Sequence, residues 1–259
     1  MKLKRIFFIT TVLFTLLGCE KALDIFLGMP FQPKNISSEY TPGLNIFGIL
    51  KAGLSYDTLN HFFEVQKLLH TSDTTEFIEI NDAEIILEQI TNNSNLITYQ
   101  LTNYNEGNYT NSELNPDFGE QWSYICTYDT FTITSQTRIP NKPVLQLGSL
   151  VSTEKIISFT IQPDTTAFLY EVFYLNESDY VFERIIPNKD EPTHVDLSKH
   201  FKNLEGSNTL FVFAYDENYE KYITTSNIFY KPNAYRPRYT SVEGGYGCFC
   251  SAASIKVEL

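Results

Sequence analysis

Apolar and polar residues alternate along many segments of this chain, and a period of two is typical of β-strands. The clearest case runs from Gln121 to Thr137. Asp129 lies in the middle of it and marks a tight turn, because Asp favours turn conformations. The pattern predicts an antiparallel hairpin. Its first strand carries on one face Trp122, Tyr124, Cys126 and Tyr128, and the alternation continues in the second strand with Phe131, Ile133 and Ser135.

Three earlier segments are also predicted to be strands: Leu44–Leu50, Asp82–Ile90 and Leu96–Thr102. His61–Leu69 fits either a strand or a short helix, and its periodicity does not decide between them. Together with the hairpin, these segments predict a transthyretin- or immunoglobulin-like β-sandwich over residues 42–139. Prolines bracket polar residues just after it, so residues 140–143 are predicted to be a stiff linker.

The second half shows short strands at regular spacing, separated by turn residues, as an immunoglobulin or fibronectin type III-like sandwich requires. We expect this second sandwich over residues 144–231 and a glycine-rich tail with a terminal strand, Ala252–Glu258, over 232–259. The chain is thus predicted to be all-β, with two β-sandwich domains in series. The expected strands of the second sandwich are Val144–Gly148, Lys155–Gln162, Ala167–Leu175, Tyr180–Ile186, Thr193–Leu197, Thr209–Asp216 and Tyr222–Tyr230.

The N-terminus has the pattern of a lipoprotein signal peptide. A basic start is followed by the apolar run Ile6–Leu17 and then by Gly18 and Cys19. The apolar run is too short to span a bilayer comfortably. We therefore expect residues 1–18 to be removed, Cys19 to be lipidated, and residues 19–41 to act as a spacer. The alternative is an ordinary cleaved signal in which the cysteine is incidental.

Charge narrows the possible partners. The net charge is −12, and loss of Lys2, Lys4 and Arg5 with the signal peptide makes it −15. Such a surface repels phosphate backbones, so no nucleic-acid partner is expected. It also disfavours electrostatic binding to membranes, which leaves the lipid as the expected membrane anchor. The predicted location is the cell envelope.

Three cysteines follow Cys19, in a compartment where disulfides form. Cys126 could pair with Cys248 or Cys250, and the odd number leaves one thiol over. A metal at the Cys248–Cys250 pair is a poorer interpretation, since no further ligand lies nearby in the sequence.

No catalytic or cofactor-binding motif is present. The four histidines are scattered, and there is no nucleophile elbow, P-loop or dinucleotide fingerprint. Acidic pairs such as Asp216-Glu217 fall in expected turns and are interpreted as solvated. We therefore expect no enzymatic activity, no metal and no cofactor.

The tail contains aromatic, arginine and glycine residues of the kind found at interfaces. This segment is a candidate loop for docking a transporter or a ligand. In the alternative structural interpretation the loop crosses back to close a sheet, with two of its aromatic side chains buried, Tyr246 and Phe249. The candidate interaction residues are Tyr235, Arg236, Arg238, Tyr239, Tyr246 and Phe249.

Several short motifs follow one another along the chain: Leu16–Cys19, Leu44–Gly48, Asp82–Ile85, Gly107–Tyr109, Trp122–Tyr124, Phe131–Thr134, Thr137–Pro140 and Gly244–Phe249. In order and spacing they resemble the uncharacterised lipoprotein family called domain of unknown function 4249, over nearly the whole mature chain. The resemblance implies an outer-membrane or periplasmic lipoprotein that accompanies TonB-dependent transporters. It implies no catalytic residues. The chain departs from the family at Cys248 and Cys250, where small or apolar residues are expected.

The sequence therefore predicts a lipid-anchored, non-enzymatic accessory or binding component of an outer-membrane complex with a TonB-dependent transporter. The first alternative is a surface adhesin or glycan-binding module. The second alternative is an envelope enzyme. Its only support is that one fold can host many unrelated functions.

Overall fold

The computed structural model describes residues 43–53, 61–68, 78–91, 96–153, 156–175, 180–198, 209–225 and 239–259. The signal peptide, Cys19 and the spacer lie outside these ranges. Within them the chain is almost entirely β-structure, and residues 42–259 form one compact unit. The all-β prediction is confirmed. No helix in the described part of the chain is long and apolar enough to cross a membrane.

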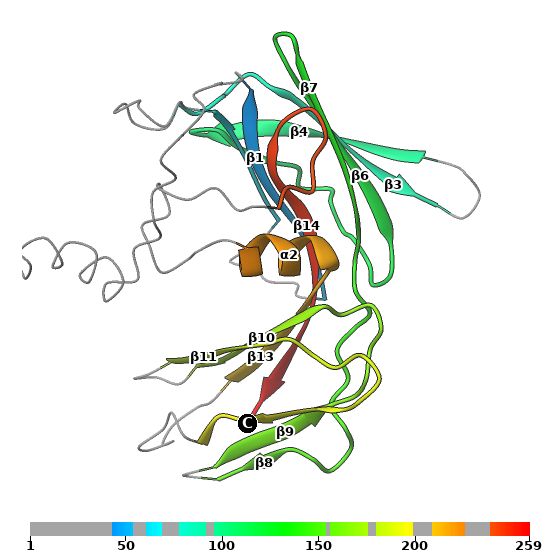
Figure 1. Cartoon of the computed structure of the whole chain (residues 1–259), viewed down its shortest axis with the longest axis vertical. Coiled ribbons are helices and arrows are strands. Elements are labelled where there is room, and N and C mark those ends of the chain that lie inside the picture. The colour runs from blue at the N-terminus through cyan, green and yellow to red at the C-terminus, as the bar shows by residue number, and fades with distance from the viewer. Residues whose placement is uncertain are drawn as a thin grey trace, which may run out of the picture. The chain divides into compact units, whose positions relative to one another are not determined.

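The second half is a β-sandwich of the immunoglobulin and fibronectin type. Three strands in the order β12-β9-β8 face four strands in the order β11-β10-β13-β14 (Figure 1). Alternate residues of both sheets are buried between them, as the sequence predicts for Ile157–Ile161 and Leu210–Ala214. Its elements are β8 (Val151–Ser152), β9 (Ile157–Ile161), β10 (Leu169–Leu175), β11 (Tyr180–Ile185), β12 (Thr193–Asp196) and β13 (Thr209–Tyr215).

The first half continues the larger sheet in the order β14-β1-β2-β5-β4-β3-β6-β7. The predicted hairpin is confirmed as β6 and β7, with Asp129 at a positive φ of 52° in the turn. His61–Leu69, ambiguous in the sequence, contains a strand. The elements are β1 (Leu44–Ala52), β2 (Phe62–Lys67), β3 (Glu84–Ile90), β4 (Leu96–Asn105), β5 (Asn108–Thr110), β6 (Gln121–Tyr128) and β7 (Phe131–Arg138).

Apolar side chains from the two ends of this half pack against each other. The Tyr124 ring of β6 lies 5.1 Å from Phe249 of β14 and 6.5 Å from Phe63 of β2, measured between centroids. The strand β7 also contacts the segment before β14. Thr134 and Glu243 form a β-bridge, and the Ser135 hydroxyl donates to the Ser241 carbonyl (2.6 Å).

The strand β14 (Tyr246–Glu258) joins both halves into one sheet. Its first part pairs in parallel with β1, from Asn45↔Tyr246 to Ala52↔Ala253. Its second part pairs antiparallel with β13, from Tyr215↔Ala252 to Thr209↔Glu258. Figure 1 shows β14 in red running from the neighbourhood of β1 to that of β13. Residues 246–258 of the predicted tail therefore form a central strand shared by both halves.

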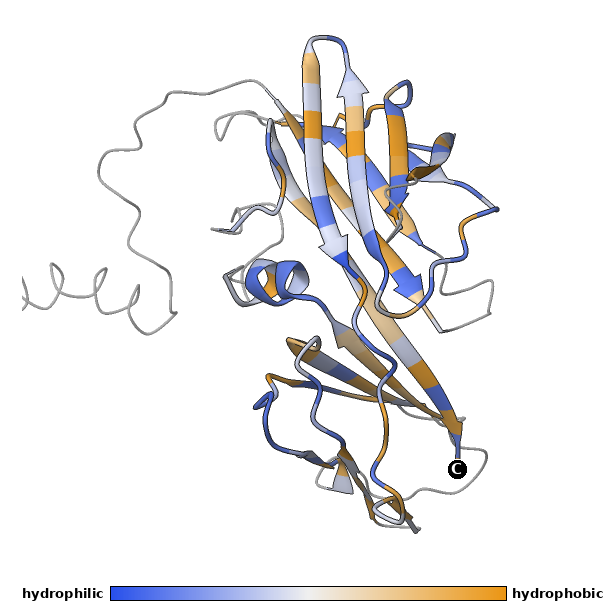
Figure 2. Ribbon diagram, turned by 90° about the vertical axis from the view of Figure 1, so that its right-hand side faces the viewer, coloured by the Kyte–Doolittle hydropathy of each residue, from blue (hydrophilic) through white to orange (hydrophobic). Residues whose placement is uncertain are grey.

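The prediction of a strand over Tyr222–Tyr230 is wrong for its described part. Residues Glu217–Thr225 form the helix α2, and residues 226–230 lie outside the described ranges. The helix packs its aromatic side chains onto the outer face of the sheet, where Tyr219 stacks on Tyr215 at 4.1 Å. Figure 2 shows alternating apolar and polar residues along the strands. The helix covers a second apolar cluster with Tyr219, Tyr222 and Ile223, beside residues that include Cys248, Cys250 and Phe213.

Close approach of backbones explains the glycines just before and at the start of β14. Gly247 has a φ of 115°, and a Cβ atom there would lie 1.8 Å from the Ile46 carbonyl oxygen. A Cβ on Gly244 would lie 2.1 Å from the Thr132 carbonyl oxygen. Only glycine lets this segment pass between β1 and β7.

We predict that Gly247→Ala lowers the free energy of unfolding by on the order of 3 kcal/mol, because β1 and β14 must separate to admit the methyl group. Gly148→Ala is the matched control, since Gly148 also has a positive φ of 72° but no atom lies within 4 Å of its Cβ position. The control should lose only about 1–2 kcal/mol, the strain of the left-handed backbone. Urea denaturation of both variants checks this, and equal losses would contradict the steric explanation.

Candidate functional site

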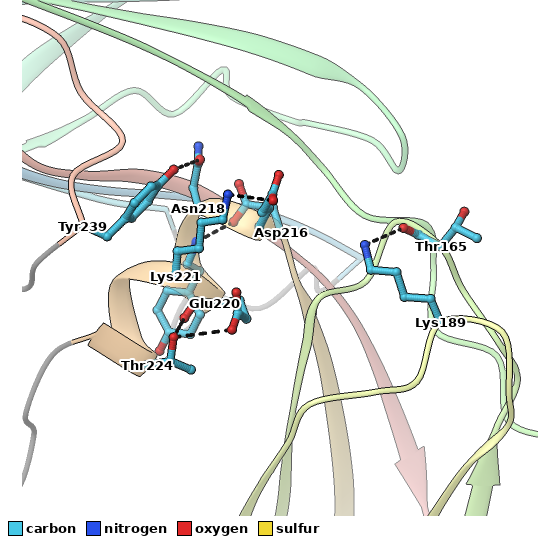
Figure 3. Close-up of polar contacts among 10 residues, drawn as sticks. Thr165, Lys189, Asp216, Asn218, Glu220, Lys221, Thr224 and Tyr239 are labelled. Carbon is cyan, nitrogen blue, oxygen red and sulfur yellow. Dashed lines mark hydrogen bonds and ion pairs between the residues drawn. The ribbon is translucent and has the colours of Figure 1, made fainter.

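The candidate site is built around Asp216, at the point where β13 ends and α2 begins. The Asp216 side chain caps the helix, because its Oδ1 accepts a hydrogen bond from the Tyr219 backbone N–H (3.0 Å). Its backbone N–H donates to the Ser251 carbonyl of β14 (3.1 Å). Figure 3 shows Asp216 at the start of the helix. The site therefore joins α2 to the central strand.

Three polar side chains from three strands or strand ends meet beneath the helix. The Thr137 hydroxyl of β7 donates to Asp216 Oδ2. Because that hydrogen is used, the Ser251 hydroxyl of β14 donates to Thr137 Oγ1, 2.7 Å away. All three residues are buried. Burial raises the pKa of the Asp216 carboxyl to about 7, and its hydrogen bonds with Thr137, Tyr219 and Ser251 only partly offset this.

Asn218 fastens the first turn of α2 to both strands. Its Nδ2 donates to the Gln136 carbonyl of β7 (2.8 Å) and to the Phe249 carbonyl of β14 (3.0 Å). Its Oδ1 accepts a hydrogen bond from the Tyr239 hydroxyl (2.9 Å), which is drawn in Figure 3. Since every polar atom of the Asn218 amide group has a partner, this side chain is structural.

A cleft of about 370 Å³ lies at this junction, along the edge of β7. One wall comes from the hairpin β6–β7, another from the start of α2, and the third from the turn before β10. Among the described residues that line it, none is a histidine or a cysteine. Its lining consists of Gln121, Gln136, Thr137, Arg138, Thr165, Thr166, Phe168, Asp216, Glu217 and Asn218.

The turn before β10 is held in place by main-chain and side-chain contacts. The Phe168 N–H donates to the Tyr215 carbonyl (2.9 Å). Lys189 donates from Nζ to the Thr165 carbonyl (3.2 Å), and the same Nζ lies over the Phe168 ring, 2.9 Å from its centroid. Figure 3 shows the Lys189–Thr165 contact. The aromatic wall of the cleft is thus fixed before any ligand binds.

Comparison with known proteins adds no assignment. No family model matches the chain, and no curated protein matches it. It is similar to a tetra-tandem repeat from the extending region of a large adhesion protein, with 7% identity and a TM-score of 0.25, over 84% of this chain and 49% of that one. The chain thus spans about half the length of that adhesion-protein chain.

Two chicken structures are also similar. The interferon gamma receptor alpha chain has 10% identity and a TM-score of 0.21, over 67% of this chain and 88% of that one. The FN1–FN3 domains of CNTN1 have 13% identity and a TM-score of 0.24, over 83% and 66%. At these TM-scores the similarities say nothing about function, and the fold is defined by its own sheet order.

The structure does not form the predicted disulfide. Cys126, Cys248 and Cys250 are all free and buried. Cys126 lies in the large apolar cluster, whereas Cys248 and Cys250 lie in the cluster beneath α2, on the other face of β14. Because β14 separates them, Cys126 does not meet either C-terminal cysteine.

No group of three or more His, Cys, Asp or Glu in the described part of the chain is arranged to hold a metal. The Cys248 and Cys250 thiols are used internally instead. Cys250 Sγ donates to the Gly48 carbonyl (3.3 Å) and Cys248 Sγ to the Asn218 carbonyl (3.7 Å).

The candidate interaction loop is only partly within the described residues. Tyr235, Arg236 and Arg238 lie outside them. Phe249 is fully buried against Tyr124, so its assignment to an interaction surface is wrong.

The two remaining loop residues are half-buried. Tyr246 pairs with Asn45 at the start of the parallel ladder. Tyr239 hydrogen-bonds to α2 through Asn218. The glycines therefore bring the backbone close to this chain's own strands, which is the alternative that the sequence left open.

Sequence reasoning missed the residues at the centre of this site. Asp216-Glu217 was interpreted as a solvated turn pair, yet Asp216 is buried. The missed signal was local: an Asp that precedes Glu217 and Glu220 has the composition of a helix N-terminus. Thr137 and Ser251 had no local signal, because they meet Asp216 only in the folded chain.

We predict that Asp216→Asn flattens the pH dependence of stability. Folding raises the pKa of this carboxyl from 3.8 to about 7. Between these two pH values the folded protein keeps the proton, whereas the unfolded protein has lost it. The contribution of this carboxyl to the free energy of unfolding therefore falls as pH rises from about 4 to about 7, by roughly 4 kcal/mol at most.

Asn keeps a side-chain oxygen for the helix cap and does not ionise. Relative to wild type, Asp216→Asn should gain stability at pH 8 compared with pH 5, as measured by urea denaturation at both values. Other titrating groups are common to both proteins and cancel in this difference. Parallel pH profiles of the two proteins would contradict the prediction.

The thiols give a second prediction. Burial raises the pKa of Cys126 to about 11 and raises that of Cys250 as well, so both are protonated at neutral pH and shielded from solvent. In a titration of the Cys19→Ala variant with a chromogenic disulfide reagent, the folded protein should react slowly and the denatured protein should release three equivalents. Release of a single equivalent from the denatured, unreduced protein would show that two of the three thiols form a disulfide and would contradict this prediction.

Proposed function

We propose that this chain is a lipid-anchored, non-enzymatic binding or accessory component of an outer-membrane complex that contains a TonB-dependent transporter. Its membership of the domain of unknown function 4249 family is part of the proposal and rests on the order of the motifs in the sequence. Cys19 after the apolar run Ile6–Leu17 supports the anchor. Two acyl signals on one terminus give stable membrane attachment.

The observation that carries the binding role is the cleft beside α2. It is a recess that exists before any ligand binds. At its floor, Thr137 of β7 donates to Asp216, and Asn218 of α2 donates to the Gln136 carbonyl of β7 and the Phe249 carbonyl of β14. These hydrogen bonds hold the walls together. Three side chains at its rim, Gln121, Gln136 and Arg138, are exposed. The floor is already ordered, so only the exposed side chains of the rim lose rotamer freedom on binding.

The chemistry of the cleft favours binding over catalysis. Its titratable group with a shifted pKa, Asp216, is occupied as a helix cap and as an acceptor for Thr137. The Thr137 hydroxyl donates to Asp216 Oδ2, and the other oxygen of that carboxyl accepts from the helix backbone. An activated nucleophile needs a base that is itself oriented by a third side chain, and Thr137 has no such arrangement in the described part of the chain. The described lining residues thus support a binding component.

The anchor is tested by the Cys19→Ala variant. This substitution removes the sulfur to which the lipid would be attached, so the protein should move from the membrane fraction to the soluble fraction. A Cys126→Ala variant is the matched control and should stay in the membrane. Immunoblots of fractionated cells measure both, and unchanged partitioning of Cys19→Ala would refute the anchor.

The complex is tested by mild-detergent purification from native membranes through a tag added after Leu259, followed by mass spectrometry. Stoichiometric recovery of a TonB-dependent β-barrel is expected. Recovery of the lipoprotein alone would refute the accessory role and favour a free-standing adhesin or glycan-binding module.

A further inference from the structure

We propose that the cleft at the edge of β7 binds a neutral saccharide. This inference rests on the proposed function as a binding component and names the ligand class of the same site. The cleft volume of about 370 Å³ lies within the range of ligand pockets, toward its lower end. A site of this size accommodates one or two sugar rings.

The rim offers groups that both donate and accept hydrogen bonds. Gln121 and Arg138 lie directly opposite each other in the ladder of β6 and β7, and Gln136 is two residues before Arg138 on the same face. All three side chains are exposed. A glutamine amide has two donors and an acceptor oxygen, which matches the dual character of a sugar hydroxyl.

The opposite wall supplies a hydroxyl and an aromatic ring. Thr165 and Phe168 belong to the turn before β10, which is fixed by the hydrogen bond from Phe168 N–H to the Tyr215 carbonyl (2.9 Å). The electron-rich face of a phenyl ring attracts polarised C–H groups, such as those on the apolar face of a pyranose. Lys189 Nζ covers one face of the Phe168 ring, so a sugar would have to meet the opposite face. Amides on one wall and this ring face on the other are complementary to the two kinds of sugar surface.

The charges around the cleft argue against a cationic ligand. Arg138 is the cation of the lining, and Glu217 and Asp216 are its carboxyl groups. Glu217 is paired with Lys221 (2.7 Å), and Asp216 is held by Thr137 and the helix cap. Because both carboxyl groups are engaged in this way, a cationic ligand is disfavoured, whereas Arg138 is compatible with a neutral or an anionic ligand. Phe168 is the one apolar side chain among the described lining residues.

The experiment is a saturation-transfer NMR screen of the purified full-length protein against glucose, galactose, N-acetylglucosamine, maltose and cellobiose. At least one sugar should give saturable binding. Gln136→Ala and Phe168→Ala should each weaken it tenfold or more. The matched controls are Gln100→Ala on β4 and Phe182→Ala on β11, both exposed and away from the cleft, and they should bind as wild type does.

Absence of binding by every sugar would overturn the inference, and so would binding that Gln136→Ala leaves unchanged. Preference for glucose 6-phosphate or glucosamine over glucose would overturn the neutral ligand class. Thermal melts establish that each variant is folded. The membrane purification, repeated with Gln136→Ala, separates the two proposals: a transporter recovered without sugar binding refutes this inference alone, and sugar binding without a transporter refutes the accessory role alone.

Discussion

The pairing of β14 with β1 and with β13 is the constraint on which the rest of this structure depends. A parallel ladder joins residues about 200 positions apart, and an antiparallel ladder follows on the same strand. Side-chain hydrogen bonds support the first ladder, since Ser254 Oγ donates to the Ala52 carbonyl (2.9 Å). Because every residue from Gly247 to Ser254 is buried, neither half of the sheet presents its own complete core without this strand.

The polar junction beneath α2 follows from that constraint. Once β14 lies between the halves, the edge of β7 and the end of β13 converge on Ser251, and their backbone groups need partners. Asn218 donates to the Gln136 and Phe249 carbonyls, while the side chains of Thr137, Asp216 and Ser251 hydrogen-bond to one another. A buried carboxyl is unfavourable when ionised, and such departures from the usual burial rules concentrate at functional sites. The residues that hold the two halves of the sheet together at this junction, Thr137, Asp216 and Asn218, also line the cleft of the proposed binding function.

The tail illustrates how one composition serves two purposes. Glycine, aromatic and arginine residues close together predict an exposed interaction loop. In the structure the glycines admit the backbone between β1 and β7, Phe249 fills the core, and the two thiols fill the face beneath α2. Residues that permit close approach to a partner permit the same approach to another strand of the chain.

The sequence by itself determined the elements whose signal is local. Alternation placed Trp122, Tyr124 and Cys126 on one buried face, and it identified β9 to β13 of the second sandwich, because side chains alternate sides along any extended chain. The predicted strand Val144–Gly148 is wrong, since this segment forms only an isolated bridge at Leu145. Helix α2 is not predicted by its local pattern, because its aromatic residues suit a strand equally well and Asp216, which caps the helix, is also a common turn residue.

Only the tertiary structure decided which strands are neighbours, that β14 belongs to both halves, and that Thr137 and Ser251 meet Asp216. Such contacts join residues far apart in the chain, so they leave no periodic trace in the sequence. They form only when burial of the whole core selects one pairing of strands.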